Sequence, residues 1–407
     1  MKRSIKIAVA AALALSGTSA FATNGDHLIG LGAKARGMGG VGIGMSHGAE
    51  SALVNPAMIT SVKGTEVSFG GTVFMPDVKT DMGANEGAYS SDADLSVIPE
   101  VSLAQNAGNG FSWGVGMWGT AGMGTDYRDA TGTIANLKMV TNLQLMQFGV
   151  PLAYKTGGLS LGIAPVLQYG SLDINYDATQ FGAGVSDTKG VAQDFGMGYN
   201  LGVAYEMEGL TVGASYKSAI DMEYKGQIKT ATTEFNGVAG TAILSDHLEQ
   251  PAEMGLGASY TMEGHTFAVD YKKIKWSDAK GYKDFGWDDQ NVYIVGYQYA
   301  QNNWALRAGY NHSKSPIKEH NGATAQGALD NMFNLLGFPA MVEDHYTIGG
   351  TYAFNKMTSI DLAYVYVPEA TERFSIAAFN GMNANVATTI ETKHSQDALS
   401  VQVNFAF

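Results

Sequence analysis

The sequence lacks several features that would place it in a common protein class. It contains no cysteine, which excludes a disulfide-stapled scaffold and a cysteine-ligated zinc site. After residue 22 it has no apolar run of about 20 residues, which a polytopic helical membrane protein would need. Its 25 Lys and Arg residues are outnumbered by 38 Asp and Glu residues, so we expect no nucleic-acid partner.

Glycine and aromatic residues are abundant instead. There are 52 glycines, 20 tyrosines and 17 phenylalanines among 407 residues, while charged residues make up only 15%. Soluble domains have about 25% charged residues and about 7% glycine. A disordered chain would carry fewer aromatics. The composition therefore indicates a large, structured, glycine-rich and tyrosine-rich protein.

The first 22 residues have the pattern of a secretory signal peptide. Lys2, Arg3 and Lys6 form a positive start, residues 7–15 are apolar, and residues 20–22 read Ala-Phe-Ala. We expect cleavage after about Ala22. An uncleaved anchor is the alternative, but it would need a longer apolar run.

From residue 65 onward the hydrophobic pattern has a period of two. Leu399, Val401 and Val403 alternate with polar residues, and the same stripe ends at Phe407. Similar alternation occurs within residues 267–272, 304–311 and 360–366. One apolar and one polar stripe per segment is the pattern of β-strands.

The connections between these segments alternate between short and long. Six short turns rich in Gly and Asn suit hairpins. Seven longer polar stretches lie near residues 77–94, 121–139, 176–191, 229–249, 276–288, 314–343 and 374–393. These thirteen connections join fourteen strands. Short turns on one side and long loops on the other are typical of bacterial outer-membrane barrels. We therefore predict an all-β fold, a 14-stranded antiparallel transmembrane β-barrel at residues 65–407. A soluble secreted β-protein is the alternative.

Residues 23–64 show no strand pattern and are rich in glycine. We expect this segment to fold into the barrel lumen as an N-terminal hatch, because fourteen strands enclose more space than wall side chains fill. Gly37, Gly39 and Gly42 match the dinucleotide fingerprint by letter. No βαβ unit surrounds them, so we read them as a glycine-rich turn and expect no cofactor.

Several motifs resemble one known family. Residues 51–60, with Asn55, Pro56 and Ala57 at their centre, look like the hatch of the FadL/TodX family of outer-membrane transporters of hydrophobic compounds. Further similar stretches span nearly the whole mature chain, at residues 199–202, 216–218, 251–254, 303–307 and 351–356.

The resemblance implies a passive transporter of long-chain fatty acids in the outer membrane of a Gram-negative bacterium. In this family, ligand is captured at outer loops, passes to an apolar pocket near the mature N-terminus, here Thr23, Asn24 and Gly25, and leaves sideways through the wall. The opening comes from an inward kink in the third strand, which we expect at residues 111–120. We place the kink at Trp118, Gly119, Thr120, Ala121 and Gly122, with ordinary barrel glycines as the alternative.

Two basic residues in the lumen phase are candidates for binding a carboxylate head group. Lys217 and Arg307 stand where the family also has basic residues. The alternative is a structural pair with a lumen acid such as Asp270 or Asp361. The family's arginine in the fifth strand has no counterpart near Tyr169, so a neutral aromatic or aliphatic hydrocarbon is an alternative cargo.

The longest outer loop, residues 314–343, contains a short apolar stretch with helical spacing. Leu329, Met332, Phe333 and Leu336 recur at this spacing before Gly337 and Pro339. We expect either a site that captures ligand or a cap over the barrel mouth.

Chemistry on the substrate is not indicated. The eight histidines show no metal-ligand spacing, so we expect no metal, and no Gly-x-Ser-x-Gly elbow is present. An outer-membrane hydrolase and a polar-solute porin remain alternatives. We expect outer-membrane lipid, lipopolysaccharide and a hydrophobic small molecule as partners. The barrel-assembly machinery should recognise the final strand, which ends at Phe407.

Overall fold

The structure is a computed structural model that describes residues 23–407 except residues 182, 189 and 236–240. The expected signal peptide, with its cleavage site after Ala22, lies outside the described residues. None of the helices in the described part is long and apolar enough to cross a membrane.

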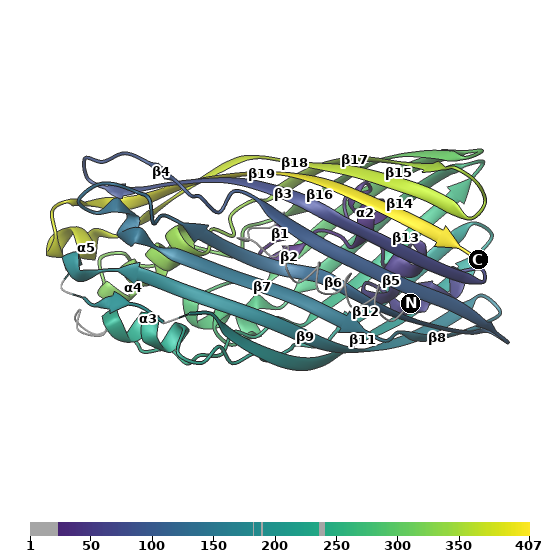
Figure 1. Ribbon diagram of the computed structural model, residues 1–407, viewed down its shortest axis with the longest axis horizontal. Coiled ribbons are helices and arrows are strands. Elements are labelled where there is room, and N and C mark those ends of the chain that lie inside the picture. The colour runs from purple at the N-terminus through teal and green to yellow at the C-terminus, as the bar shows by residue number, and fades with distance from the viewer. Residues whose placement is uncertain (1–22, 182, 189, 236–240) are drawn as a thin grey trace, which may run out of the picture.

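Fourteen long strands of the described chain form one closed antiparallel sheet, which confirms the predicted barrel (Figure 1). The last strand closes the barrel by pairing with the first, from Glu391 opposite Asp81 to Ala406 opposite Glu66. The fourth strand is interrupted and carries two labels. The strands are β3 (Thr65–Gly83), β5 (Ser96–Gly108), β6 (Phe111–Asp126), β7 (Val140–Gly149) continued by β8 (Leu152–Thr156), β9 (Leu159–Asp177), β11 (Ala192–Met207), β12 (Leu210–Lys217), β13 (Glu253–Met262), β14 (His265–Ile274), β15 (Gln290–Gln301), β16 (Trp304–Ser313), β17 (Asp344–Ala353), β18 (Thr358–Ser375) and β19 (Val386–Ala406).

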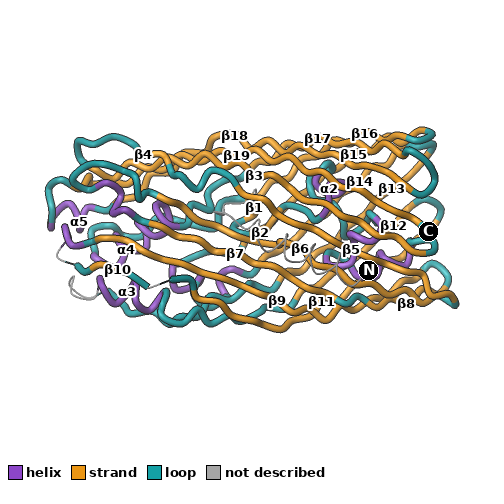
Figure 2. The backbone as a smooth tube through the Cα atoms, in the orientation of Figure 1, coloured by secondary structure: helices purple, strands orange, loops and turns teal. Residues whose placement is uncertain are grey.

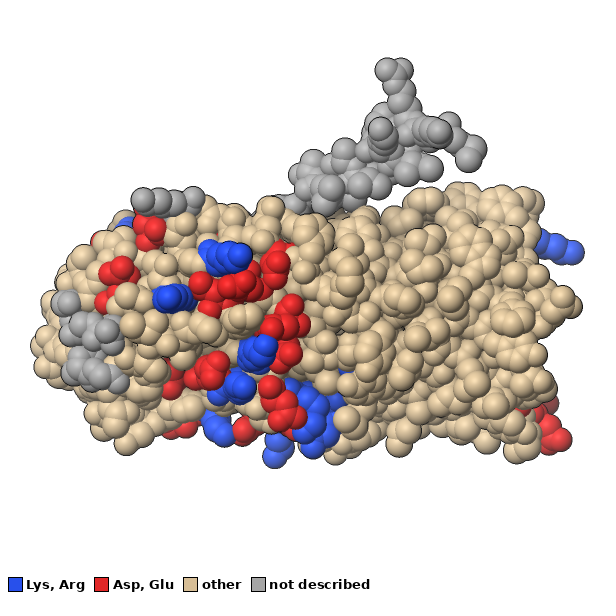
Figure 3. All heavy atoms as spheres, turned by 90° about the horizontal axis from the view of Figure 1, so that it is seen from below, with Lys and Arg blue, Asp and Glu red and all other residues tan. Residues whose placement is uncertain are grey.

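Side chains alternate between the two faces of the wall, as the period of two requires. On β13, Met254, Leu256 and Tyr260 are exposed on the outside, while Ser259 is buried on the inside. Figure 3 shows on one face a broad zone free of Lys, Arg, Asp and Glu beside a band rich in them. An apolar belt of this kind matches the hydrocarbon core of a membrane.

The remaining elements are short and lie inside or at one end of the barrel. Helices α3, α4 and α5 gather at one end of the barrel, and short turns join the strands at the other (Figure 2). The short strands are β1 (Thr23–Asn24), β2 (His27–Leu28), β4 (Tyr89–Ser90) and β10 (Val185–Ser186). The helices are α2 (Gly32–Arg36), η1 (Gly48–Leu53), η2 (Pro56–Ser61), η3 (Ala135–Lys138), η4 (Thr179–Phe181), α3 (Ile228–Phe235), η5 (Trp276–Asp278), η6 (Tyr282–Phe285), α4 (Ala325–Met332), η7 (Phe333–Gly337) and α5 (Ala377–Met382).

Some strand boundaries differ from the predicted ones. Strand β3 continues to Gly83 and β6 continues to Asp126, into stretches predicted as loops. Polar residues can continue a strand beyond the apolar belt because backbone pairing, rather than lipid contact, holds it there. The fourth strand breaks between Gly149 and Leu152. Pro151 in this break has no N–H to donate to a ladder.

Candidate functional site

The motif Asn55-Pro56-Ala57 packs against wall glycines on the inner face of the barrel. Pro56 begins helix η2, and the Asn55 side chain caps it by accepting a hydrogen bond from the Ala57 N–H at 3.1 Å. A Cβ added to Gly162 would lie 2.4 Å from the Ala57 nitrogen, and one added to Gly202 would lie 2.0 Å from Asn55 Oδ1. The motif therefore fits only against a wall without side chains at these positions.

Long-range hydrogen bonds tie the rest of residues 32–55 to the barrel. The Asp270 carboxylate of β14 accepts from three consecutive backbone N–H groups, at 2.7 Å from Gly42, 2.8 Å from Ile43 and 3.3 Å from Gly44. The Asn200 amide of β11 donates to the Leu53 carbonyl at 2.8 Å. The segment is thus held inside the barrel by directional bonds as well as by burial.

Helix α2 carries two basic residues into a network of lumen carboxylates. Arg36 donates to Glu100 of β5, and to Thr72 of β3 at 2.6 Å. Lys34 Nζ lies 3.5 Å from Glu50 and 3.8 Å from Asp361 of β18. Paired charges of this kind offset the cost of burying each ion alone.

The expected N-terminal residues Thr23, Asn24 and Gly25 open a hairpin made of β1 and β2. All three are buried, and Gly25 at the turn has φ +68°, which favours glycine. A Cβ at Gly25 would lie 2.5 Å from the ring of Trp276. Tight packing at this turn therefore also requires glycine.

The next residue, Asp26, connects this hairpin to three other parts of the protein. Its carboxylate accepts from the Tyr282 hydroxyl, and from the Gln250 amide at 3.0 Å. Its backbone carbonyl accepts from the N–H of Gly122 on β6 at 3.1 Å. Burial raises the pKa of the Asp26 carboxyl above its usual value.

Strand β6 leaves its neighbour β5 within the range where we expected a kink. Pairing of the two strands ends at Trp118 opposite Glu100. The pairing of β6 with β7 shifts register between Gly119 and Ala121, so Thr120 is the extra residue of a bulge. Beyond the bulge, Ala121 pairs instead with His27 of the N-terminal hairpin.

Burial along β6 changes at the same place. Phe111, Trp113 and Val115 are exposed on the outer face, alternating with buried residues. From Met117 to Asp126 every residue except the half-buried Thr120 is buried. The outer half of β6 has therefore left the lipid-facing surface, and β5 lacks its β6 partner there.

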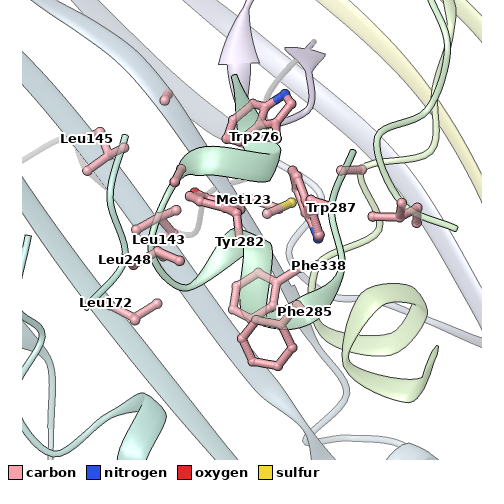
Figure 4. Close-up of a cluster of buried hydrophobic side chains, with 14 of the residues drawn as sticks. Met123, Leu143, Leu145, Leu172, Leu248, Trp276, Tyr282, Phe285, Trp287 and Phe338 are labelled. Carbon is pink, nitrogen blue, oxygen red and sulfur yellow. The ribbon is translucent and has the colours of Figure 1, made fainter. Parts of the chain in front are cut away.

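An apolar cavity lies against this outer half of β6. It is a narrow space of about 20 Å³ between side chains that come from the wall and from outer loops. Figure 4 shows Trp276, Tyr282 and Trp287 grouped at one side of the cluster and Phe285 and Phe338 at another. The ring centroids of Trp276 and Tyr282 are 4.7 Å apart, and those of Tyr282 and Trp287 are 4.8 Å apart. The lining residues are Met123, Leu172, Ile174, Ile228, Leu248, Tyr282, Phe285, Trp287, Asn334 and Phe338.

A second, polar pocket lies beside the bulge. Thr120 lines it together with His27, Lys217, Gln250 and Glu253. Because Gln250 lines this pocket and Tyr282 lines the apolar cavity, the Asp26 carboxylate that both contact lies between the two spaces.

Both expected head-group cations have carboxylate partners. Lys217 Nζ lies 3.0 Å from Oε1 of the buried Glu253. Arg307 is buried and lies 3.6 Å from Asp361, the partner named as an alternative, and it donates to Thr351 at 2.7 Å. Lys217 faces the polar pocket, and neither cation lines the apolar cavity.

The expected outer-loop residues form one wall of the buried cluster. Leu329, Met332, Phe333 and Leu336 are each no more than 1% exposed. Leu329 and Met332 belong to α4, whereas Phe333 and Leu336 belong to the π-helical turn η7. The four side chains pack inward as a cap, and ligand capture by them stays a prediction. The ring centroid of Phe333 lies 6.2 Å from that of Phe235 of α3 and 5.7 Å from that of Phe285.

Sequence reasoning missed the aromatic lining of the cavity. Trp276, Tyr282, Phe285 and Trp287 fall in a stretch assigned only as a long polar loop. Four large aromatic residues within twelve positions of an outer loop were the available signal. Among the described residues, no group of three or more His, Asp or Glu side chains could hold a metal ion.

Comparisons with known proteins agree with this fold. Residues 7–407 match the family described as outer membrane protein transport protein (OMPP1/FadL/TodX). The long-chain fatty acid transport protein of Salmonella typhi is 24% identical over 384 residues, covering 80% of this chain and 85% of that protein.

Solved structures share the fold. The toluene transporter TodX of P. putida has a TM-score of 0.68 at 20% identity, covering 93% of this chain and 99% of that one. A FadL homologue of Pseudomonas aeruginosa has a TM-score of 0.68 at 14% identity, covering 94% and 100%. Since the family match spans residues 7–407, the chain belongs to the FadL/TodX family of outer-membrane transporters of hydrophobic compounds.

Proposed function

We propose that the chain carries uncharged hydrophobic compounds, such as small hydrocarbons, passively from the cell surface into the outer membrane. The observation that carries this proposal is the apolar cavity beside the broken β5–β6 pairing. No Lys, Arg or His is among the described residues that line it. An uncharged ligand can enter such a lining without having to strip water from a charged group.

The arrangement of the two spaces along β6 supports a sideways exit. Met123 of β6 lines the apolar cavity, and Thr120 of the same strand lines the polar pocket at the bulge. The hairpin turn with Asp26 stands between them. We propose that the turn moves aside and that cargo leaves between β5 and β6, past Trp118 to Gly122. Pro99 of β5, next to this break, offers no N–H that would reseal it.

Residues 23–64 act in this proposal as the hatch that closes the lumen to water. Their burial and their bonds to Asp270, Asn200 and Glu100 support a fixed plug rather than an open pore. An open lumen would instead favour a polar-solute porin, which is the alternative function that the sequence leaves open.

Long-chain fatty acids are the second candidate cargo. The polar pocket with Lys217 and His27 favours them, because a carboxylate could compete there with Glu253. The relative from Salmonella typhi is named as a fatty acid transporter. Its identity of 24% leaves the cargo of this chain to experiment.

Two further partners, the barrel-assembly machinery and lipopolysaccharide, are proposed for the two ends of the barrel. Phe407 follows β19, and its N–H donates to the Thr65 carbonyl at 2.8 Å, next to the closing pair of strands. We propose that the assembly machinery reads this terminal strand. We also propose that lipopolysaccharide contacts the charged rim of the outer end.

Uptake of labelled toluene and labelled oleate tests the proposal. Cells that lack their own transporter would express the chain, and its folded state would be checked by heat-modifiable migration on gels. Toluene uptake without saturable oleate uptake supports the first candidate. Saturable oleate uptake that Lys217→Gln reduces supports the second.

A matched pair of variants on β9 links uptake to the cavity. Leu172 lines the cavity and is fully buried, whereas Leu167 on the same strand faces lipid. Leu172→Trp should block uptake by overfilling the cavity, and Leu167→Trp should leave it unchanged. Equal uptake by both folded variants would rule out the cavity as the route.

A further inference from the structure

A groove runs across the lipid-facing surface of β16, β17 and β18. It has a volume of about 730 Å³ and is open to the membrane side. The three strands lie next to one another in the wall (Figure 1). The groove lies outside the barrel and shares no lining residue with the apolar cavity or the polar pocket. It therefore needs its own explanation.

The register of the strands explains its shape. Leu306 of β16, Gly350 of β17 and Leu362 of β18 form one row across the sheet. Leu306 is 59% and Leu362 is 48% exposed, so Gly350, which has no side chain, lies between two exposed leucines, one on each neighbouring strand. Ile348 and Tyr352, the next outward residues along β17, bound the notch above and below.

The floor of this notch is backed by the N-terminal segment. Gly349 turns toward the lumen, where a Cβ would lie 2.9 Å from the Cα of Gly37, next to helix α2. Gly350 turns the other way, where a Cβ would meet only Ala305 O at 3.3 Å and Leu306 Cδ2 at 3.7 Å. The wall cannot bend inward to close the notch, because α2 and its flanking residues fill the space behind it.

Aromatic and charged residues set the depth of the groove in the membrane. Trp304 pairs with Tyr352, two residues from Gly350 along β17 and close to the short turns that face the periplasm in such barrels. The Gly350 row lies about 7 Å above these aromatics, at about 3.4 Å per residue. The exposed Lys356 lies in the turn that joins β17 to β18. The groove thus belongs to the inner leaflet, which consists of phospholipids.

We propose that this groove holds an acyl chain of an anionic phospholipid of the inner leaflet, with the lipid phosphate at Lys356. The apolar notch is continuous with the membrane-facing belt, so lipid is what covers it. Lys356 supplies the charge that complements the phosphate. Lipopolysaccharide does not fit, because its acyl chains lie in the other leaflet.

Native mass spectrometry of the full chain in detergent, with added palmitoyl-oleoyl phosphatidylglycerol or phosphatidylcholine, tests the site. The wild type should retain one phosphatidylglycerol in preference to phosphatidylcholine. Gly350→Leu fills the notch and should lose this lipid. Lys356→Gln should weaken its binding about fivefold, as expected for about 1 kcal/mol per surface lysine, and abolish the preference for the anionic lipid.

Two control variants distinguish the site from general lipid contact. Ala258→Leu places the same side chain on the lipid face of β13, and Lys63→Gln removes another exposed lysine outside the strands. Both should bind as the wild type does. Equal retention of phosphatidylglycerol by all variants would overturn the proposal. A complex of two chains that only Gly350→Leu removes would also overturn it, because the groove would then bind a second copy of the chain. Failure of toluene and oleate uptake would leave this result untouched.

Discussion

At the residue scale, the role of the Asn55 side chain is to satisfy buried backbone groups. Its amide donates to the Ile43 carbonyl at 2.8 Å and to the Val203 carbonyl at 3.2 Å, and its oxygen accepts from Ala57. Asn55 therefore links η2, the preceding glycine-rich turn and β11. A side chain with both donors and an acceptor is required, which explains why asparagine precedes the proline.

We predict that Asn55→Ala lowers the free energy of unfolding by about 1–3 kcal/mol, because it leaves buried backbone groups without partners. Urea unfolding in detergent micelles, followed by tryptophan fluorescence, measures this. Asn385→Ala, at an exposed loop position, should leave the midpoint unchanged. A similar loss in both variants would contradict this account of Asn55.

At the element scale, β6 is the strand whose two halves have different neighbours. Its first half pairs with β5 in the wall, and its second half contacts the N-terminal hairpin. The N–H of Gly122 bonds to the carbonyl of Asp26, so His27 and Ala121 form the non-hydrogen-bonded pair beside it. In such pairs the Cα atoms lie about 4.5 Å apart. That distance is compatible with a disulfide.

We predict that a disulfide between His27→Cys and Ala121→Cys blocks uptake and that a reductant restores it. The native chain has no cysteine, so this pair would be the only one present. The cross-link would hold the hairpin against β6 and keep the sideways route closed. Each single cysteine variant serves as a control. Full uptake by the oxidised double variant would show that the hairpin does not need to move.

The outer-loop element α4–η7 behaves as part of the packed interior. We predict that Phe333→Ser destabilises the folded barrel by about 3–5 kcal/mol, as expected for truncating a buried aromatic. Phe333→Leu should recover most of the loss, because it keeps apolar volume. The measurement is the temperature at which heat-modifiable migration is lost. Unchanged stability with reduced uptake in Phe333→Ser would favour the capture interpretation instead.

At the scale of the whole molecule, the barrel is filled from both directions. The N-terminal segment occupies the lumen, and the outer loops pack an apolar cluster above it. Lumen charges form pairs between residues far apart in the chain, as Arg36 does with Glu100 and Arg307 with Asp361.

We predict that deleting residues 24–60 raises ion conductance in planar bilayers, because it removes the segment that fills the lumen of a fourteen-strand barrel. Selective uptake of hydrophobic cargo should be lost at the same time. The full-length chain in the same bilayer is the control. Unchanged conductance in a folded deletion variant would argue against a plug.

The barrel architecture can be predicted from the sequence alone. Alternation along single strands and the sequence of short and long connections are local properties, so they can be counted without coordinates. Strand ends were less predictable, as in β3, because polar residues continue pairing beyond the lipid belt. The position of the break near Trp118 to Gly122 was expected from a family resemblance and from glycine, which is common in every strand.

The organisation of the lumen, in contrast, depends on long-range contacts that no local pattern reveals. Asp26 meets Tyr282, and Arg307 meets Asp361, across wide separations in the chain. Whether Leu329 faces solvent or the core, and whether Lys217 is paired, depend on contacts of this long-range kind. Local pattern sets which face of a strand is apolar, whereas a cavity is made by side chains that meet only after the barrel has closed.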